Sequence, residues 1–154
     1  MVQVRIALPS DASAIGAVIR SESSDFLVDP EGDEARRFFA ALEPEGIEKA
    51  IADPSRFYMV AVDRGVVVGV INVRDQNYVS QFFVANTHQR RGVGRLLWEH
   101  ALKRVVLAGG TGEFTVSSSL AAQAIYARFG FLPTGEQTIQ NGFRFVPMRR
   151  AAAK

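Results

Sequence analysis

Hydrophobic positions alternate with polar ones in several short runs, and between these runs they recur at helical spacing. Residues 2–8 alternate as a strand does, and apolar positions then repeat every three or four residues from Ala12 to Ile19. Three β-rich runs with short turns between them fill the middle of the chain, at residues 56–63, 66–74 and 77–84. We expect these three runs to form an antiparallel meander.

The second half of the chain begins with the longest helical stripe, which runs from Val93 to Val105 and ends near Gly109. Asn141-Gly142 joins the last two β-rich runs, and this pair of residues between two such runs is a strong hairpin signal. The other elements expected here are a strand over 114–117, a helix over 121–129, and strands over 132–140 and 143–148.

The least regular part of the chain lies between the first helix and the meander. Residues 21–34 are polar and contain Pro30 and Gly32, and two short helical stretches follow over 36–42 and 45–52. The expected order of elements is βα(α)βββαβαββ, which predicts a mixed α/β fold with helices packed on a central sheet.

Length and composition are those of one globular domain. The chain has 154 residues, of which 47% are hydrophobic and 22% are charged. We expect one domain over residues 1–150 and a frayed tail over 151–154. No apolar run reaches the roughly 18 residues that cross a bilayer, and the first residues lack the pattern of a secretory signal. The expected location is the cytoplasm, without a membrane partner.

The residue types that are present exclude several kinds of chemistry. The chain contains no cysteine, which excludes disulfides, thiolate metal ligands and an acyl-cysteine intermediate. Its two histidines, His88 and His100, are too few for a multi-histidine metal site, and no carboxylate pattern suggests one. We therefore expect no metal.

Charge is distributed unevenly between the two halves of the chain. Residues 1–77 carry 8 basic and 13 acidic side chains, whereas residues 78–154 carry 10 basic and 3 acidic ones. An anionic ligand should therefore prefer the second half. Arg supplies 15 of the 18 cations, so a genomic preference for Arg is an alternative source of part of this bias. Nucleic acid is not expected, because no basic tract is interleaved with aromatic residues.

The segment most suggestive of chemistry is Gln89-Arg90-Arg91-Gly92-Val93-Gly94-Arg95, between a strand and the longest helix. Its glycines allow a tight turn, and the start of the helix leaves N–H groups unpaired at the positive end of the helix dipole. Its three arginines add planar donors that suit phosphate oxygens. A glycine-rich turn with exposed arginines is the simpler interpretation, but it does not explain why the arginines cluster there.

Two other phosphate-binding motifs do not fit this segment. A P-loop needs Gly-Lys-Ser/Thr at the start of the helix, where the chain has Gly94-Arg95-Leu96. A dinucleotide fingerprint needs a third glycine three residues after Gly94, where the chain has Leu97. Both motifs are therefore excluded.

The loop is one of three segments that together match a known family. Phe82-Phe83-Val84 followed by Gln89-Arg90-Arg91-Gly92-Val93-Gly94 fits a strand with a Gln/Arg-x-x-Gly-x-Gly/Ala signature. Residues 122–131 fit the pattern Ala-x-x-x-Tyr-x-x-x-Gly-Phe, and residues 141–148 are similar to the last hairpin of a bacterial subgroup. In these segments the chain resembles the GNAT superfamily of acetyl-CoA-dependent N-acetyltransferases. The resemblance implies a three-layer fold with a mostly antiparallel sheet of about seven strands, splayed between strands four and five.

The resemblance also implies binding of acetyl-CoA and transfer of its acetyl group to a primary amine by direct attack in a ternary complex. The pyrophosphate would rest on the loop, and the pantetheine arm would lie beside the fourth strand like an added strand. The implied acetyl-CoA-binding residues are Phe82, Phe83, Val84, Gln89, Arg90, Arg91, Gly92, Val93, Gly94, Arg95, Ser119, Ala122 and Tyr126. An N–H near Val84 would polarise the thioester carbonyl. Ser119 is shorter than the Asn that the family often has at its position.

Tyr126 is the implied catalytic residue. A phenol held near the sulfur can protonate the departing CoA thiolate. Spacing alone favours a different role, a core tyrosine on the face of a helix.

No general base is assigned. Many relatives carry a Glu on the fourth strand, where this chain has Tyr78, Ser80 and Gln81. Asp75, Glu136 and His88 are candidates by their places in the sequence, although each is more simply a solvated turn residue. A water relay or an amine that arrives neutral would remove the need for a base, and alignment of the reactants would then supply much of the acceleration.

The acceptor is left open as a small-molecule or peptide amine, because no motif constrains residues 21–54 or the last hairpin. The acidic first half, with Glu22, Asp25 and Asp29, favours a cationic or polar amine, unless it is only a solvated surface. Two other functions stay open, a CoA-binding regulatory module without turnover and a modifier of a protein acceptor. A homodimer is compatible with the resemblance, because dimers are common in the family.

Overall fold

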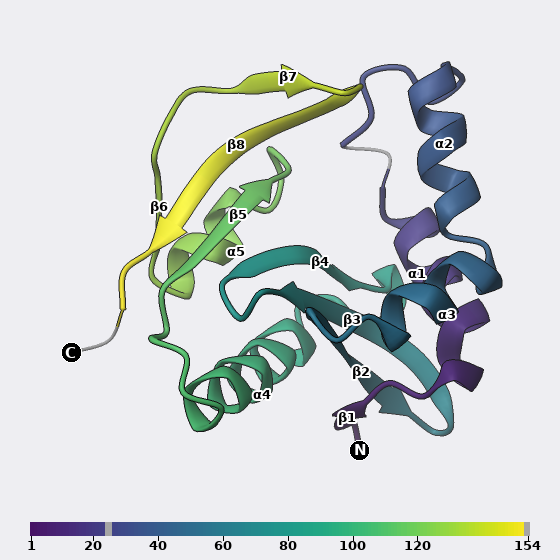
Figure 1. Ribbon diagram of the computed structural model, residues 1–154, viewed down its shortest axis with the longest axis vertical. Coiled ribbons are helices and arrows are strands. Elements are labelled where there is room, and N and C mark those ends of the chain that lie inside the picture. The colour runs from purple at the N-terminus through teal and green to yellow at the C-terminus, as the bar shows by residue number, and fades with distance from the viewer. Residues whose placement is uncertain (24–25, 153–154) are drawn as a thin grey trace.

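The computed structural model describes residues 1–23 and 26–152, and it forms an eight-stranded sheet with helices on both faces (Figure 1). The strands are β1 (Gln3–Ile6), β2 (Arg56–Asp63), β3 (Val66–Arg74), β4 (Tyr78–Val84), β5 (Phe114–Ser118), β6 (Phe131–Pro133), β7 (Thr138–Gln140) and β8 (Phe143–Arg150). The helices are α1 (Ala12–Ser21), α2 (Asp33–Ala41), α3 (Pro44–Ala52), α4 (Val93–Leu107) and α5 (Gln123–Arg128), with 3-10 turns η1 (Pro9–Asp11) and η2 (Asn86–His88).

The sheet opens between β4 and β5. Its strands follow the order β1-β2-β3-β4-β5-β8-β6, with β7 also paired to β8. Every pairing is antiparallel except that of β4 with β5, which covers only Tyr78 opposite Thr115 and Val79 opposite Val116. The rest of β4 therefore has one free edge. The mixed α/β fold and the expected splay between strands four and five are confirmed.

Two hydrophobic cores hold the layers together. Under α4 and α5, Leu97 packs with Phe114 and other residues of the sheet, and Trp98 stacks on Phe129 at 5.6 Å between ring centroids. Under α1 and α3, Ile19 packs on the opposite face of the sheet with other buried aliphatic residues. Because apolar side chains from helices cover both faces, β3 is buried from Val68 to Val73.

The run predicted as one strand over residues 132–140 is two strands, so the sheet has eight strands rather than about seven. Proline has no N–H for the ladder, and Pro133 ends β6. The chain then turns through Gly135 before it pairs with β8 again at Thr138. The last strand also runs longer than predicted, to Arg150, and the expected frayed tail lies partly outside the described residues.

The irregular segment after α1 reaches the last hairpin. Leu27 forms a β-bridge with Phe143, and the Val28 N–H donates to the Gly142 carbonyl oxygen at 3.0 Å. The Arg144 N–H donates to the Phe26 carbonyl oxygen at 2.8 Å. This contact joins residues 21–54 to the last hairpin, the two parts of the chain in which no motif indicated the acceptor.

Candidate active site

The loop between β4 and α4 presents main-chain N–H groups and arginines at the start of the longest helix. Gly92 has φ of 82°, a left-handed conformation that suits glycine, and an added Cβ there would meet nothing within 4 Å. The first N–H groups of α4 point out of the helix at its positive end. Arg90, Arg91 and Arg95 are exposed around this end. The arrangement is suited to an anion such as a phosphate.

Gln89 ties this loop to two other parts of the chain. Its Nε2 donates to the Val84 carbonyl oxygen and to Glu22 Oε1, each at 2.9 Å. Glu22 Oε2 also accepts the Asn86 N–H at 3.3 Å. Glu22 was predicted only as a source of negative field for the acceptor, and no sequence signal indicated that it contacts this loop.

The main chain of β4 turns its free groups toward the opening. The Ala85 N–H donates to the Val68 carbonyl oxygen of β3 at 2.8 Å. Main-chain groups of a strand alternate between its two edges, so the N–H and C=O of Phe82 and Val84 face away from β3. Of these, the Val84 carbonyl oxygen already accepts the hydrogen bond from Gln89 Nε2. An extended amide-containing chain could pair with this edge, which is the place beside Phe82, Phe83 and Val84 that the family resemblance implied for pantetheine.

Tyr126 reaches the same opening from α5. Its ring lies edge-on to Phe82 at 5.9 Å and to Phe131 at 5.3 Å between ring centroids. Burial, and secondarily the nearby Tyr78, raises the pKa of the Tyr126 hydroxyl well above its usual value. That hydroxyl has no hydrogen-bond partner in the described part of the chain.

Residues 26–152 match the model of an acetyltransferase (GNAT) domain. The chain belongs to the GNAT acetyltransferase family. This match covers the opening, the loop and Tyr126, and it confirms the family that the sequence motifs indicated. No curated protein matches the sequence.

Solved structures show the same GNAT fold at low sequence identity. The PaiA N-acetyltransferase from Thermoplasma acidophilum in complex with coenzyme A superposes with a TM-score of 0.80 at 14% identity, covering 97% of this chain and 98% of that one. A GCN5-related N-acetyltransferase from Rhodopseudomonas palustris gives 0.75 at 20% identity, over 97% and 94% of the chains. An aminoglycoside 6'-N-acetyltransferase complexed with coenzyme A gives 0.71 at 13% identity, over 96% of each chain.

Ser119 lies in the turn of this GNAT domain between β5 and α5. Its hydroxyl accepts the Ala122 N–H at 3.3 Å, and its carbonyl oxygen accepts the same N–H at 3.2 Å. The side chain therefore stabilises the turn before α5. Contacts of Ser119 and Ala122 with acetyl-CoA stay predictions.

The three candidate bases do not converge on the opening of the GNAT fold. His88 contacts Asp63 Oδ2 through Nε2 and Thr87 Oγ1 through Nδ1, both at 2.8 Å, which directs its ring toward the β2–β3 turn. Asp75 is exposed in the β3–β4 turn, 3.8 Å from the Arg74 guanidinium, and Glu136 is exposed between β6 and β7. We therefore assign no base.

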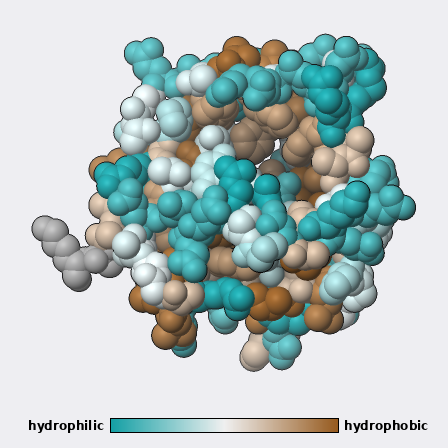
Figure 2. Space-filling model, viewed as in Figure 1, coloured by the Kyte–Doolittle hydropathy of each residue, from teal (hydrophilic) through white to brown (hydrophobic). Residues whose placement is uncertain are grey.

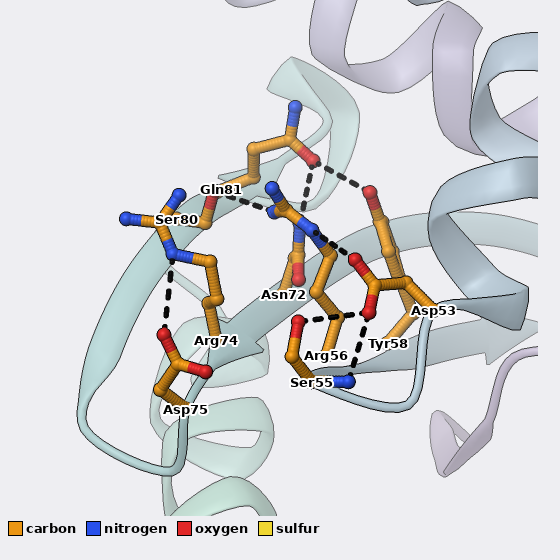
Figure 3. A network of polar contacts seen from close by, with 9 residues as sticks. All are labelled: Asp53, Ser55, Arg56, Tyr58, Asn72, Arg74, Asp75, Ser80 and Gln81. Atoms are coloured by element: carbon orange, nitrogen blue, oxygen red, sulfur yellow. Dashed lines mark hydrogen bonds and ion pairs between the residues drawn. The ribbon is translucent and has the colours of Figure 1, made fainter.

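A polar network lies beside the opening on the face that carries α1 and α3 (Figure 3). Gln81 Oε1 accepts hydrogen bonds from the Tyr58 hydroxyl at 3.3 Å and from Asn72 Nδ2 at 3.2 Å. Arg56 Nη1 donates to Ser80 Oγ at 3.2 Å. This network occupies the part of β4 where many relatives were expected to carry a Glu, and no motif predicted it.

Neither a metal site nor a membrane-spanning helix is found in the described residues. No group of three or more His, Asp or Glu side chains lies together in residues 1–23 and 26–152 in a way that could hold a metal ion. Within the same ranges, every helix is too short or too polar to cross a bilayer.

Proposed function

We propose that this GNAT protein transfers an acetyl group from acetyl-CoA to a primary amine by direct attack in a ternary complex. The observation that carries the proposal is the continuity of three features along one opening. The free edge of β4 leads to the N-terminus of α4, and Tyr126 lies edge-on to Phe82 on that strand. These features suit a thioester arm, a pyrophosphate and a proton donor, respectively.

The residues present fit acetyl-CoA as the donor substrate. The N–H groups at the start of α4, with Arg90, Arg91 and Arg95, would hold the pyrophosphate. At Gly94 an added Cβ would lie 3.8 Å from both Phe82 and Val84, an ordinary contact distance, so the start of α4 packs directly beside this strand. The Phe82 main-chain groups and the Val84 N–H would hold the pantetheine amides, and a β4 N–H would orient the carbonyl to be attacked.

Bound acetyl-CoA supplies the activated acetyl group as a thioester. The neutral amine nitrogen forms a bond to the carbonyl carbon, and the bond between carbon and sulfur breaks. Tyr126 donates its proton to the departing sulfur, and the proton lost by the amine passes to water. The acetylated amine and CoA are the products, and Tyr126 regains its proton from solvent.

The test is the release of CoA thiol with a broad panel of primary amines, measured together with binding of acetyl-CoA. We expect thiol release that depends on the amine, with the acetylated amine identified by mass spectrometry. Tight binding of acetyl-CoA without turnover on any amine, peptide or protein acceptor would instead favour a regulatory CoA-binding module. The only support for that second function is the lack of a carboxylate on β4.

A further inference from the structure

We propose that the acceptor is a monoamine with an aromatic or branched aliphatic body, and that a row of four phenylalanines binds this body. This inference rests on the proposed function and adds a substrate class to it. The row consists of Phe83 on β4, Phe26 after α1, Phe143 on β8 and Phe38 on α2.

The four rings form a continuous path from the strand at the opening to the surface. Phe83 lies 6.3 Å from Phe26, Phe26 lies 5.9 Å from Phe143, and Phe143 lies 5.2 Å from Phe38, all between ring centroids. The last two pairs are edge-on, an arrangement that leaves ring faces available to a further aromatic or aliphatic group. The row exists only because the segment after α1 is bonded to the last hairpin.

The rings are only half-buried, although they lie between packed elements. A cavity of about 330 Å³ adjoins the outer end of the row, lined by Glu34, Arg37, Phe38, Asn141 and Phe143. Figure 2 shows a hollow in the same view as Figure 1, with hydrophobic residues on its walls. Partly exposed apolar surface in a concavity is typical of a site for an apolar ligand group.

Phe83, at the inner end of the row, determines how a bound acceptor is oriented. Phe83 lies between Phe82 and Val84, whose main-chain groups face the opening where the thioester is proposed to lie. An amine nitrogen at the opening therefore places the rest of the acceptor against Phe83, Phe26 and Phe143. The body of the acceptor must be apolar to bury these rings favourably.

The row itself argues against a polyamine. Its four rings offer no charged group to a second ammonium, and burial of such a group against phenylalanine is costly. Among the described carboxylates on this side, Asp33 pairs with Arg36, Asp53 with Arg56 and Asp75 with Arg74. Glu22 and Asp29 accept hydrogen bonds from uncharged groups and keep their charge, and Glu34 lines the cavity together with Arg37. The expected preference against a polyamine therefore rests on the cost of burying its further charges, which spermidine tests in the experiment below.

The experiment compares amines of different body and charge on the full chain. We would measure kcat/KM for phenethylamine, isopentylamine, ethanolamine and spermidine, and also the affinity of each amine for the protein saturated with CoA, by calorimetry. The second measurement does not require turnover. We expect phenethylamine and isopentylamine to exceed ethanolamine and spermidine by at least tenfold in both measurements.

Substitutions in the row test whether its phenylalanines cause the preference for apolar amines. Phe38→Ala should reduce the preference for phenethylamine over ethanolamine by at least about fivefold. Phe143→Leu keeps an aliphatic side chain, so it should reduce the preference for isopentylamine over ethanolamine less than the preference for phenethylamine over ethanolamine. Phe57→Ala is the matched control, because Phe57 is also half-buried but lies under Arg104, away from the row. It should leave the preference unchanged even if it lowers stability.

The outcomes separate the two proposals. Phenethylamine that binds without being acetylated supports the row and contradicts the proposed transfer to amines. Turnover that favours spermidine or ethanolamine contradicts the row and supports the transfer. A preference that is equally sensitive to Phe57→Ala and Phe38→Ala, or no binding of any apolar amine, overturns the inference.

Discussion

Glu22 and Gln89, 67 positions apart in the sequence, are joined by a hydrogen bond of 2.9 Å between Oε1 and Nε2. A carboxylate therefore lies on the loop that is proposed to hold the pyrophosphate. Since Gln89 also binds the Val84 carbonyl oxygen, this one amide side chain links the segment after α1, the free strand and the loop.

Replacing Glu22 with Gln should raise the affinity for acetyl-CoA about two- to fivefold at low salt. The substitution keeps an acceptor for Gln89 and removes a negative charge that repels the pyrophosphate. The gain should vanish near 0.5 M salt, because exposed charges are then screened. Calorimetric titration with acetyl-CoA at two salt concentrations measures this gain in affinity. Glu136→Gln, which removes the same charge from an exposed position elsewhere, is the control. An equal gain at both concentrations would show that the effect is not electrostatic.

Tyr126→Phe should lower turnover at least about tenfold and leave the affinity for acetyl-CoA unchanged. The substitution keeps the ring against Phe82 and Phe131 and removes the proton donor, and general acids typically contribute roughly 10²- to 10⁴-fold. The melting temperature should hardly change. A purely structural tyrosine would instead keep its rate, and its stability would also hardly change, because the hydroxyl has no hydrogen-bond partner among the described residues. Turnover therefore distinguishes the two roles, and the affinity and melting temperature confirm that the variant still binds and folds.

Arg91→Glu combined with Gly94→Asp should abolish stabilisation by acetyl-CoA. A ligand that binds only the folded state stabilises by about 2.7 kcal/mol at 100 times its dissociation constant. The double substitution adds two negative charges where the pyrophosphate is proposed to rest. Thermal melting with and without acetyl-CoA measures the shift, and Arg128→Glu on α5 controls for a general change of charge. A shift that survives the double substitution would mean that the pyrophosphate binds elsewhere.

The stability of the fold should fall in acid through Asp11. Two hydrogen bonds from Arg5, at 2.7 and 3.0 Å, and one from the Leu8 N–H lower the pKa of this nearly buried carboxyl. Because the pKa is lower in the folded state, the stabilisation is complete above the unfolded value near 4 and is lost as pH falls through the folded value.

Asp11→Asn removes this charge. It should lower the free energy of unfolding by about 1 kcal/mol at pH 7, a modest figure because Arg5 is partly exposed. The difference from the wild-type chain should shrink between about pH 4 and pH 2. Urea unfolding of both proteins across this pH range measures the difference in their free energies of unfolding. Asp33→Asn, in an exposed pair with Arg36, is the control and should change little. A difference that persists at pH 2 would exclude the ion pair as its cause.

The parts of the fold that were predictable are those with a strong local pattern. The β2–β4 meander and α4 lie where alternation and the helical stripe placed them, since short turns and one continuous apolar face determine them locally. The break between β6 and β7 was missed. Pro133 and Gly135 are signals for such a break, but the β-rich run around them suggested one strand.

In the candidate site, the sequence indicated the loop and Tyr126 but not their surroundings. The loop is a contiguous motif, so its residues come together wherever the chain folds this way. The Glu22–Gln89 contact, the network around Gln81 and the phenylalanine row each join residues from distant elements. Such contacts depend on how the layers pack, and a single sequence carries no periodic signal for them. Asp25, which was expected to contribute charge near the acceptor, lies outside the described residues.

The bridge between Leu27 and Phe143 makes the order of synthesis matter for this protein. The loop and α4 have all their residues once the ribosome has passed the middle of the chain. The proposed acceptor wall instead needs the segment after α1 and β8, which lie far apart in the sequence, so it can close only after β8 has been made. The proposed acceptor wall therefore depends on a contact that a chain truncated before the final hairpin could not form.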